Sequence, residues 1–239
     1  MKIALIGYGK MGKAIEEIAL SRGHEIVLKV GIENLEDNTV EKISKADVAI
    51  EFTGPEVAFE NIKRCLDAGV PVVSGSTGWL KNLQEAESYS KAKQTGFLYS
   101  SNFSIGVNIF FAVNKKLASL MSRHDSYEVS LTEVHHTQKK DAPSGTAITL
   151  AEQVMQQIPA KNKWVNEWTD DKTALSIISE RIDPAPGTHT VTYRSEIDDI
   201  EIKHTAHNRK GFAGGAVLAA EFLQNKNGVY HMNDVLGIE

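Results

Sequence analysis

The chain has 239 residues and a formal net charge of −5, with 41% hydrophobic and 24% charged residues. This is the composition of a globular protein with a sizeable core, and the acidic charge argues against a nucleic-acid or anionic-membrane surface. Cys65 is the only cysteine, which excludes an intrachain disulfide. The N-terminus lacks the pattern of a signal peptide, and no apolar run approaches the ~20 residues of a membrane helix. We therefore expect a cytoplasmic protein that binds neither nucleic acid nor a membrane.

Short apolar runs alternate with helical patterns in the first part of the chain. Runs typical of buried strands cover residues 2–6, 25–30, 47–52, 71–75 and 96–100. Helical patterns cover residues 11–19, 55–69 and 81–94, and the second of these begins at Pro55 and is closed by Gly69. This alternation predicts an α/β fold with a Rossmann-type, doubly wound parallel sheet and ligands at the carboxyl ends of its strands. We assign residues 1–103 to a dinucleotide-binding domain.

The pattern changes after residue 103. A long helix is predicted over 105–121, an alternating strand over 127–136, and a second helix from Ser144 to before Pro159. Further strands are predicted over 174–179, 188–194 and 199–206, whereas residues 160–173 support no assignment. Strands grouped in this way predict a second α+β domain built on an open mixed sheet over 104–211, which we assign to substrate binding, catalysis and oligomerisation. Residues 212–228 read as a helix, so we expect 212–239 to return to the first domain.

The segment "IGYGKMG" places Gly7, Gly9 and Gly12 between the first strand and the first helix. This G-x-G-x-x-G spacing allows a tight turn, a close approach to a pyrophosphate, and close helix–strand packing. Glu33 follows at about the 20-residue distance from which an acid binds the adenosine ribose. The alternative for the three glycines is a glycine-rich turn without a ligand, and the alternative for Glu33 is a solvated loop acid. The polar strand ends at 51–56 and 74–79 fit either the nicotinamide side of a cleft or ordinary turns.

The segment "EVHHTQKKDAPSGTA" over 133–147 combines groups that bind anions and move protons. Ser144 is a good N-cap, so the amides of Gly145 and Thr146 would form a carboxylate site at a helix N-terminus. His136, Lys139 and Lys140 lie within one short loop of it. Adjacent histidines on a strand face opposite ways, so at most one of His135 and His136 needs to be functional. A histidine pair also suggests a metal, but no third ligand has recognisable spacing, and we predict no metal site.

This segment resembles the signature E-x-H-H-x-x-K-x-D-A-P-S-G-T of the 4-hydroxy-tetrahydrodipicolinate (dihydrodipicolinate) reductases, and every fixed letter is present. The resemblance extends to "EFTGPE", "GSTGW", "NFSIGVN", "IEIKHTAHNRKGFAGGA" and "GVYHMNDVL", and so covers nearly the whole chain. The chain departs from the family with "AGGA" in place of "ANGA", with the turn "APGTH" over 185–189, and with a clipped loop after Glu33.

The resemblance implies an enzyme that reduces 4-hydroxy-tetrahydrodipicolinate to tetrahydrodipicolinate with hydride from NADH or NADPH and loss of water, in diaminopimelate and lysine biosynthesis. The substrate would be a cyclic imine dicarboxylate, and the assembly a homotetramer. His135 would be the acid/base group and Lys139 the proton donor, with the choice between them left open. His136, Gly145 and Thr146 would bind the substrate. The dinucleotide would contact Gly7, Tyr8, Gly9, Lys10, Met11, Gly12, Glu33, Phe52, Thr53, Gly75, Ser76, Thr77, Ser100, Ser101, Asn102 and Phe103.

Glu33 beside Asn34 favours NADH, because a 2′-phosphate needs an arginine there and none follows. Lys10 and Lys29 are the basic residues near enough to modify this preference. Two alternatives remain at the level of sequence. One is another two-domain dehydrogenase of amino acids or semialdehydes, although Cys65 lies within a predicted helix and is poorly placed as a thioester nucleophile. The other is a non-catalytic dinucleotide sensor, which would tolerate loss of His135 and Lys139.

Overall fold

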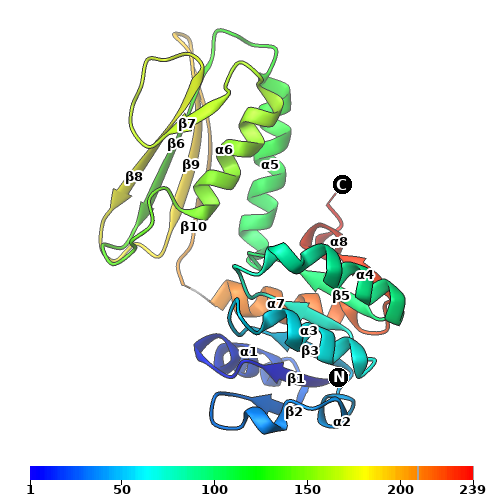
Figure 1. The fold of residues 1–239 in the computed structure, drawn as a ribbon. Helices are drawn as coiled ribbons and strands as arrows, with labels where there is room; N and C mark the ends of the chain where they lie inside the picture. The colour runs from blue at the N-terminus through cyan, green and yellow to red at the C-terminus, as the bar shows by residue number, and fades with distance from the viewer. Residues whose placement is uncertain (209, 239) are drawn as a thin grey trace. The chain divides into compact units, whose positions relative to one another are not determined.

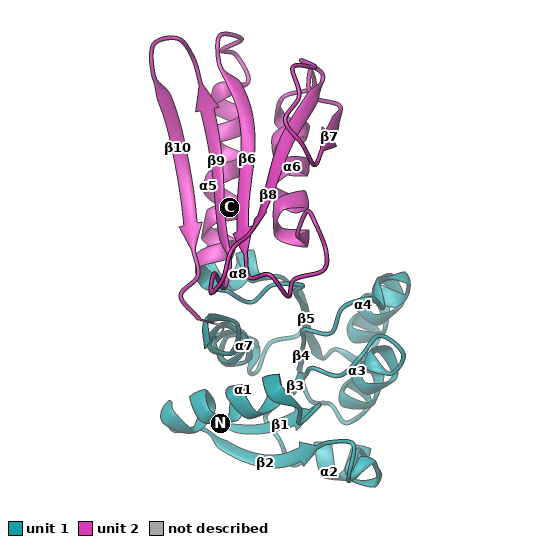
Figure 2. Cartoon of the chain, turned by 90° about the vertical axis from the view of Figure 1, so that its left-hand side faces the viewer, with its two compact units in different colours: residues 1–105, 210–239 teal, residues 106–209 magenta. Residues whose placement is uncertain are grey.

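A computed structural model describes residues 1–208 and 210–238. The chain divides into two compact units, one formed by the described residues of 1–105 and 210–239 and the other by those of 106–209 (Figure 2). The C-terminal segment is therefore part of the first unit. Within the described ranges, no helix is both long and apolar enough to cross a membrane.

Unit 1 is built on one parallel sheet, as the alternating sequence pattern predicts (Figure 1). Its strands are β1 (Lys2–Ile6), β2 (Glu25–Val30), β3 (Val48–Glu51), β4 (Val72–Ser74), β5 (Gly96–Tyr99) and β11 (Gly228–Tyr230). They lie in the order β11-β5-β4-β3-β1-β2, and every neighbouring pair is parallel. The chain thus reverses its direction of winding beside β1, where doubly wound sheets bind their ligands.

Helices cover both faces of this sheet. One face packs against α1 (Lys10–Ser21), α7 (Lys210–Leu223) and α8 (Met232–Leu236), and the other against α2 (Val40–Ile43), α3 (Ala58–Asp67) and α4 (Leu83–Lys93). Two short 3₁₀ turns, η1 (Leu35–Asp37) and η2 (Leu80–Asn82), precede α2 and α4. Strand β1 shows why the buried part of a strand in this sheet is apolar on both sides: Ile3 and Leu5 enter one core, and Ala4 and Ile6 the other.

Two predicted boundaries differ from the structure by more than two residues. The helix predicted over 212–228 ends at Leu223, and Gly228–Tyr230 forms strand β11 beside β5. A strand of three residues is too short to show a period of two, which explains the error. The helix predicted from Pro55 begins only at Ala58, because the amides of Val57 and Ala58 both bond to the carbonyl of Gly54 in a turn.

Unit 2 is an open mixed sheet covered by two helices on one face. Its strands are β6 (Glu128–His135), β7 (Lys163–Val165), β8 (Ala174–Arg181), β9 (Thr188–Arg194) and β10 (Asp199–Thr205), in the order β10-β9-β6-β8-β7. The pairs β10–β9 and β9–β6 are antiparallel, while β6–β8 and β8–β7 are parallel. Helices α5 (Ile105–Met121) and α6 (Gly145–Gln157) pack on the buried face. The sheet confirms the predicted α+β unit, and β7 lies in the stretch that the sequence left unassigned.

The tail is held on the sheet by a close helix contact. A Cβ built on Gly215 of α7 would lie 1.7 Å from the carbonyl oxygen of Phe103, whereas one built on Gly214 meets only Ile18, at 3.9 Å. The glycine pair in "AGGA" thus contains one residue that packing requires and one that it does not.

We predict that Gly215→Ala lowers the free energy of unfolding by about 1–3 kcal/mol, because α7 must move away from the chain at Phe103. Gly214→Ala should leave stability unchanged or raise it by up to about 1 kcal/mol, since alanine favours helix. Urea unfolding of the two variants tests this. Equal effects would show that α7 does not depend on this contact.

Candidate active site

The glycine loop has the geometry of a dinucleotide cradle. Gly7 has a φ of +103°, and a Cβ there would lie 2.0 Å from the carbonyl oxygen of Phe52. A Cβ on Gly12 would lie 2.4 Å from the carbonyl of Gly7, so both positions are required by packing. Gly9 has no neighbour within 4 Å of its Cβ position. The open space at Gly9, directly before α1, fits the close approach of a pyrophosphate to a helix N-terminus.

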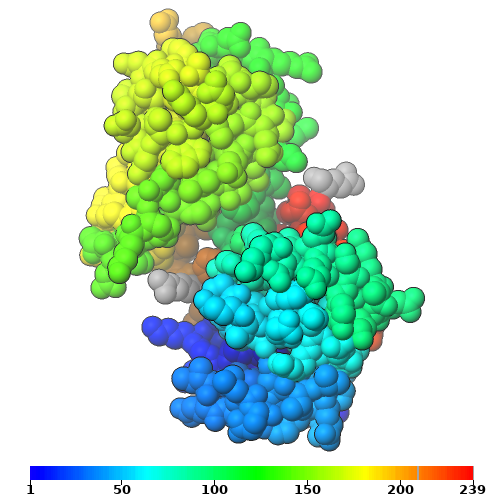
Figure 3. All heavy atoms as spheres, in the orientation of Figure 1, coloured from blue at the N-terminus to red at the C-terminus, as the bar shows by residue number. Residues whose placement is uncertain are grey.

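A cavity of about 1000 Å³ lies beside this loop, at the carboxyl ends of β1, β2 and β3. In Figure 3 the dark-blue first residues are seen between the blue segment that includes β2 and the cyan segment around α3. Six predicted cofactor residues line it: Gly7, Tyr8, Gly9, Glu33, Phe52 and Thr53. The other ten, Lys10, Met11, Gly12, Gly75, Ser76, Thr77, Ser100, Ser101, Asn102 and Phe103, are not among its lining residues. Lys13 of α1 and Asn61 and Arg64 of α3 do line it. Sequence reasoning missed the two α3 residues because α3 carries no motif, and it missed Lys13 because that residue follows the last glycine of the loop.

Hydrogen bonds and an ion pair order the chain next to Glu33. The Asn34 side chain accepts from the amide of Gly31 at 2.8 Å and donates to the carbonyl of Lys29 and to Asp37. Its hydrogen bonds therefore hold the loop after β2. Lys29 forms an ion pair with Glu16 at 2.6 Å. The exposed Glu33 lines the cavity together with Asn34, whereas Lys29 is not among its lining residues.

Glu51 joins the loops that follow β3 and β4. Its carboxyl is fully buried and accepts from Ser74 and Ser76 at 2.7 Å, from the Thr53 amide at 2.9 Å, and from the Thr53 hydroxyl. Burial raises the pKa of this carboxyl, and those hydrogen bonds oppose the rise. The predicted cofactor residues Thr53 and Ser76 are thereby held together, since the amide of Thr53 also donates to the Ser76 hydroxyl at 2.8 Å.

The second group of predicted residues lies at one end of unit 2. His135 is the last residue of β6, and Gly145 and Thr146 are the first two of α6. Ser144 caps this helix by accepting from the amide of Ala147, which confirms the predicted N-cap. The first amides of a helix have no partner within it, so Gly145 and Thr146 can bind an anion.

Lys139 lies in the loop between β6 and α6. Its ammonium donates to both carboxylate oxygens of Asp141 at 2.8 Å. This interaction lowers the pKa of Asp141. The guanidinium of Arg181 fixes the same loop by donating to the carbonyl of Asp141 at 2.6 Å. Lys139 is therefore oriented by its ion pair, and the loop backbone is tied to β8.

Glu133 lies two residues before His135 and is fully buried. It accepts from the Ser144 amide, at 3.0 and 3.1 Å, and from the Ser179 hydroxyl at 2.8 Å, and forms an ion pair with Arg181 at 3.3 Å. Burial acts to raise the pKa of Glu133, but hydrogen bonds from His189, Ser144 and Ser179 outweigh it, so the pKa lies well below its usual range. Glu133 is thus a carboxylate.

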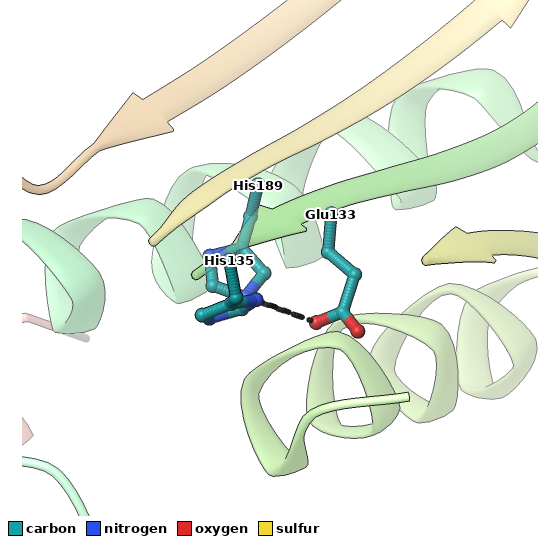
Figure 4. Close-up of side chains that lie close together, drawn as sticks. All are labelled: Glu133, His135 and His189. Carbon is teal, nitrogen blue, oxygen red and sulfur yellow. Dashed lines mark ion pairs between the residues drawn. The ribbon is translucent and has the colours of Figure 1, made fainter. Parts of the chain in front are cut away.

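His135 faces this carboxylate and a second imidazole. Its Nδ1 lies 3.4 Å from Oε2 of Glu133, and its ring meets that of His189 edge-on, with centroids 5.0 Å apart (Figure 4). Burial lowers the pKa of His135 to about 4; Glu133 opposes this, whereas His189, Lys139 and Arg181 act in the same direction as burial. The imidazole is therefore neutral near pH 7.

The neighbouring residues His135 and His136 do not form a pair in the structure, because His135 lies with Glu133 and His189. Glu133, His135 and His189 place one nitrogen or oxygen each within 4.8 Å of one another, and His136 is not in this group. His136 is half-buried just beyond β6. Sequence reasoning missed His189 because it is 54 positions from His135 in the chain, and only the pairing of β6 with β9 brings the two together.

A Rossmann sheet with a glycine-loop cavity, joined to an α+β unit carrying a histidine, a lysine and an anion-binding helix terminus, defines a two-domain, nicotinamide-dependent oxidoreductase. Models of the dihydrodipicolinate reductase N-terminus and C-terminus match residues 1–103 and 106–236. The chain belongs to the dihydrodipicolinate reductase family, which acts in diaminopimelate and lysine biosynthesis, as the resemblance predicts.

Individual relatives and a solved structure agree with this family assignment. A 4-hydroxy-tetrahydrodipicolinate reductase from Christiangramia forsetii is 50% identical over 99% of this chain and 98% of its own. One from Neisseria meningitidis serogroup C is 31% identical over 93% of this chain and 84% of its own. The fold matches that of a dipicolinate-bound dihydrodipicolinate reductase from Paenisporosarcina sp. TG-14, with a TM-score of 0.77, 22% identity and 97% of both chains covered.

Proposed function

We propose that this protein reduces 4-hydroxy-tetrahydrodipicolinate to tetrahydrodipicolinate, with loss of water, using a reduced nicotinamide dinucleotide. The observation that carries the proposal is the segment from Glu133 to Thr146, which supplies a buried histidine, an oriented lysine and a helix N-terminus within one unit. Unit 1 supplies the glycine-loop cavity for the dinucleotide. Family membership favours this reaction over the other dehydrogenases and the non-catalytic sensor that the sequence left open.

Substrate binding is assigned to the start of α6. The amides of Gly145 and Thr146 would bind one carboxylate of the cyclic imine dicarboxylate, aided by the partial positive charge of the helix N-terminus. His136 would contact the substrate from the end of β6. Loss of the 4-hydroxyl as water gives the conjugated imine that is then reduced.

Proton delivery is assigned to Lys139 or His135. A reduced nicotinamide dinucleotide, when bound, would supply the hydride that C4 of the substrate accepts. Negative charge then develops toward the ring nitrogen and its carboxylate, and C3 takes a proton. Positive groups around that carboxylate stabilise the transition state more than the ground state. Asp141 orients Lys139, and a lysine ammonium is the form that donates a proton.

Lys139→Ala should lower kcat by about two or more orders of magnitude, which is the typical contribution of a general acid, and leave the affinity for the dinucleotide nearly unchanged. The substrate is made in place by condensing aspartate semialdehyde with pyruvate, and the absorbance of the reduced nicotinamide is followed. The exposed neighbour Lys140, replaced by alanine, is the control and should keep its activity. Equal loss of turnover and of dinucleotide affinity in Lys139→Ala would contradict the role.

We also propose that NADH is preferred to NADPH. Glu33 would bind the ribose hydroxyls and repel a 2′-phosphate, and Lys29 is already paired with Glu16. Lys13 and Arg64, which line the cavity, are the basic groups able to reduce the discrimination.

Replacing Glu33 with alanine should weaken NADH binding by roughly 10–100-fold, the effect of losing hydrogen bonds to a charged group, and should narrow the difference between the two dinucleotides. Fluorescence titration of the wild type and the variant with NADH and with NADPH gives the ratio of the two dissociation constants for each protein. Glu36→Ala is a matched control, because Glu36 is a nearby acid that does not line the cavity. An unchanged ratio in Glu33→Ala would assign the preference elsewhere.

We further propose that the protein is a homotetramer in the cytoplasm. Both helices of unit 2 pack on one face of its sheet, and the other face presents Thr132, Thr190 and Thr192 in neighbouring strands. An open face of paired strands is suited to being covered by other copies of the chain. We expect sedimentation equilibrium to give a tetramer and Thr190→Lys, which places a charge on this face, to give smaller species. A wild-type monomer would be contrary to this.

A further inference from the structure

The Glu133 carboxylate has two sides with different partners. Oε1 faces only donors: the Ser144 amide at 3.0 Å, the Ser179 hydroxyl at 2.8 Å and the Arg181 guanidinium at 3.3 Å. Oε2 receives the Ser144 amide at 3.1 Å and otherwise faces two imidazoles, Nδ1 of His135 at 3.4 Å and Nε2 of His189 at 3.6 Å (Figure 4). The orientation of the carboxylate is therefore set from the Oε1 side, and Oε2 is presented to the histidines.

Strand register explains why these three side chains meet. Glu133 and His135 are two residues apart on β6, so they lie on the same face of the sheet. Glu133 is also directly opposite His189 in the antiparallel pair with β9. His189 lies 3.1 Å from the hydroxyl of Ser144, the cap of α6, which places it between the sheet and that helix. All three side chains are buried.

We propose that Glu133 is a positioning residue for His135, with His189 packed beside both groups. The Glu133 carboxylate accepts a hydrogen bond from Nδ1–H of His135, so that Nε2 remains free to exchange a proton with the substrate. This rests on the proposed acid/base role of His135. The separation of 3.4 Å is long for a hydrogen bond, as is common in active sites before substrate binds. Nδ1 of His135 is buried and has no hydrogen bond within normal geometric limits among the described residues, so Oε2 is the acceptor available to it.

The alternative use of this cluster, as a metal site, is disfavoured by charge. The ligand atoms are close enough to bind one ion. However, Arg181 lies 3.3 Å from the same carboxylate, and the Ser144 amide donates to both of its oxygens. A divalent cation would be placed beside a fixed guanidinium, and the carboxylate charge is already compensated.

Glutamine at position 133 should reverse the tautomer of His135. The amide oxygen of glutamine must face the three donors on the Oε1 side, which turns its NH₂ toward the histidines. An NH₂ group cannot accept a hydrogen bond from Nδ1–H, but it can donate one to an unprotonated Nδ1. His135 would then carry its proton on Nε2, where the proposed chemistry requires a free nitrogen.

The test is the tautomer of His135 measured by ¹⁵N NMR of histidine-labelled protein without ligands, with His135→Asn used to assign the signals. We expect the Nδ1–H form in the wild type and the Nε2–H form in Glu133→Gln. Ser179→Ala is the matched control: it removes one donor from the same carboxylate on the Oε1 side and should leave the tautomer unchanged. In parallel, kcat of Glu133→Gln should fall by roughly 10²-fold, the lower range for general acid–base catalysis, while KM and dinucleotide affinity change little.

The pH dependence gives a further readout. The charged and titratable groups facing His135 are Glu133, His189, Lys139 and Arg181. Of these, only Glu133 favours the imidazolium, so its replacement by glutamine should move the titration of His135 to lower pH. This shift reports the proximity of the carboxylate to the imidazole, and the tautomer reports the direction of the hydrogen bond.

Three results would overturn the proposal. The first is a wild-type His135 in the Nε2–H form. This measurement does not depend on the folding of any variant. The second is an unchanged tautomer in folded Glu133→Gln. The third is stoichiometric zinc binding by the wild type that Glu133→Gln abolishes, since the carboxylate would then be a metal ligand. A reversed tautomer with full activity would instead count against the role of His135 in the proposed function and leave the positioning contact intact.

Discussion

A carboxylate that is wholly removed from water has to be compensated where it lies, because an uncompensated buried charge costs several kcal/mol. Glu133 is such a group, and its compensation comes from three separate elements. The helix N-terminus at Ser144, the β8 residues Ser179 and Arg181, and the β9 residue His189 all converge on it. The same contacts bring the end of β6 and the start of α6 together. The arrangement of the groups assigned to the substrate therefore follows from satisfying one charge.

Unit 1 uses a related solution at its own strand ends. Glu51 is as deeply buried as Glu133, but its hydrogen-bond partners among the described residues include no cation. They are the hydroxyls of Thr53, Ser74 and Ser76 and one amide. Correspondingly, burial raises the pKa of Glu51, while the pKa of Glu133 lies below its usual range. The difference illustrates how the number and charge of donors decide the state of a buried carboxyl.

Features that depend on local sequence were predicted well. The glycine spacing, the alternation of strands and helices, and the cap at Ser144 each follow from contacts within a few residues. Weak local signals led to errors or gaps: β11 has only three residues, and β7 lies in a polar stretch without periodicity. Neither strand could form alone, and each depends on a neighbour, β5 or β8, to complete its hydrogen bonds.

The amino-acid sequence by itself determined the class of each unit, the glycine cradle, and the family signature with its histidine, lysine and helix cap. The tertiary structure decided which of these groups act on one another. His189 reaches Glu133 only through strand pairing, Lys29 is paired with Glu16 of α1, and α3 supplies part of the cavity wall. The reason is physical. Periodicity and capping are encoded by neighbours in the chain, whereas the partner of a buried charge is chosen by register and packing between segments far apart in it.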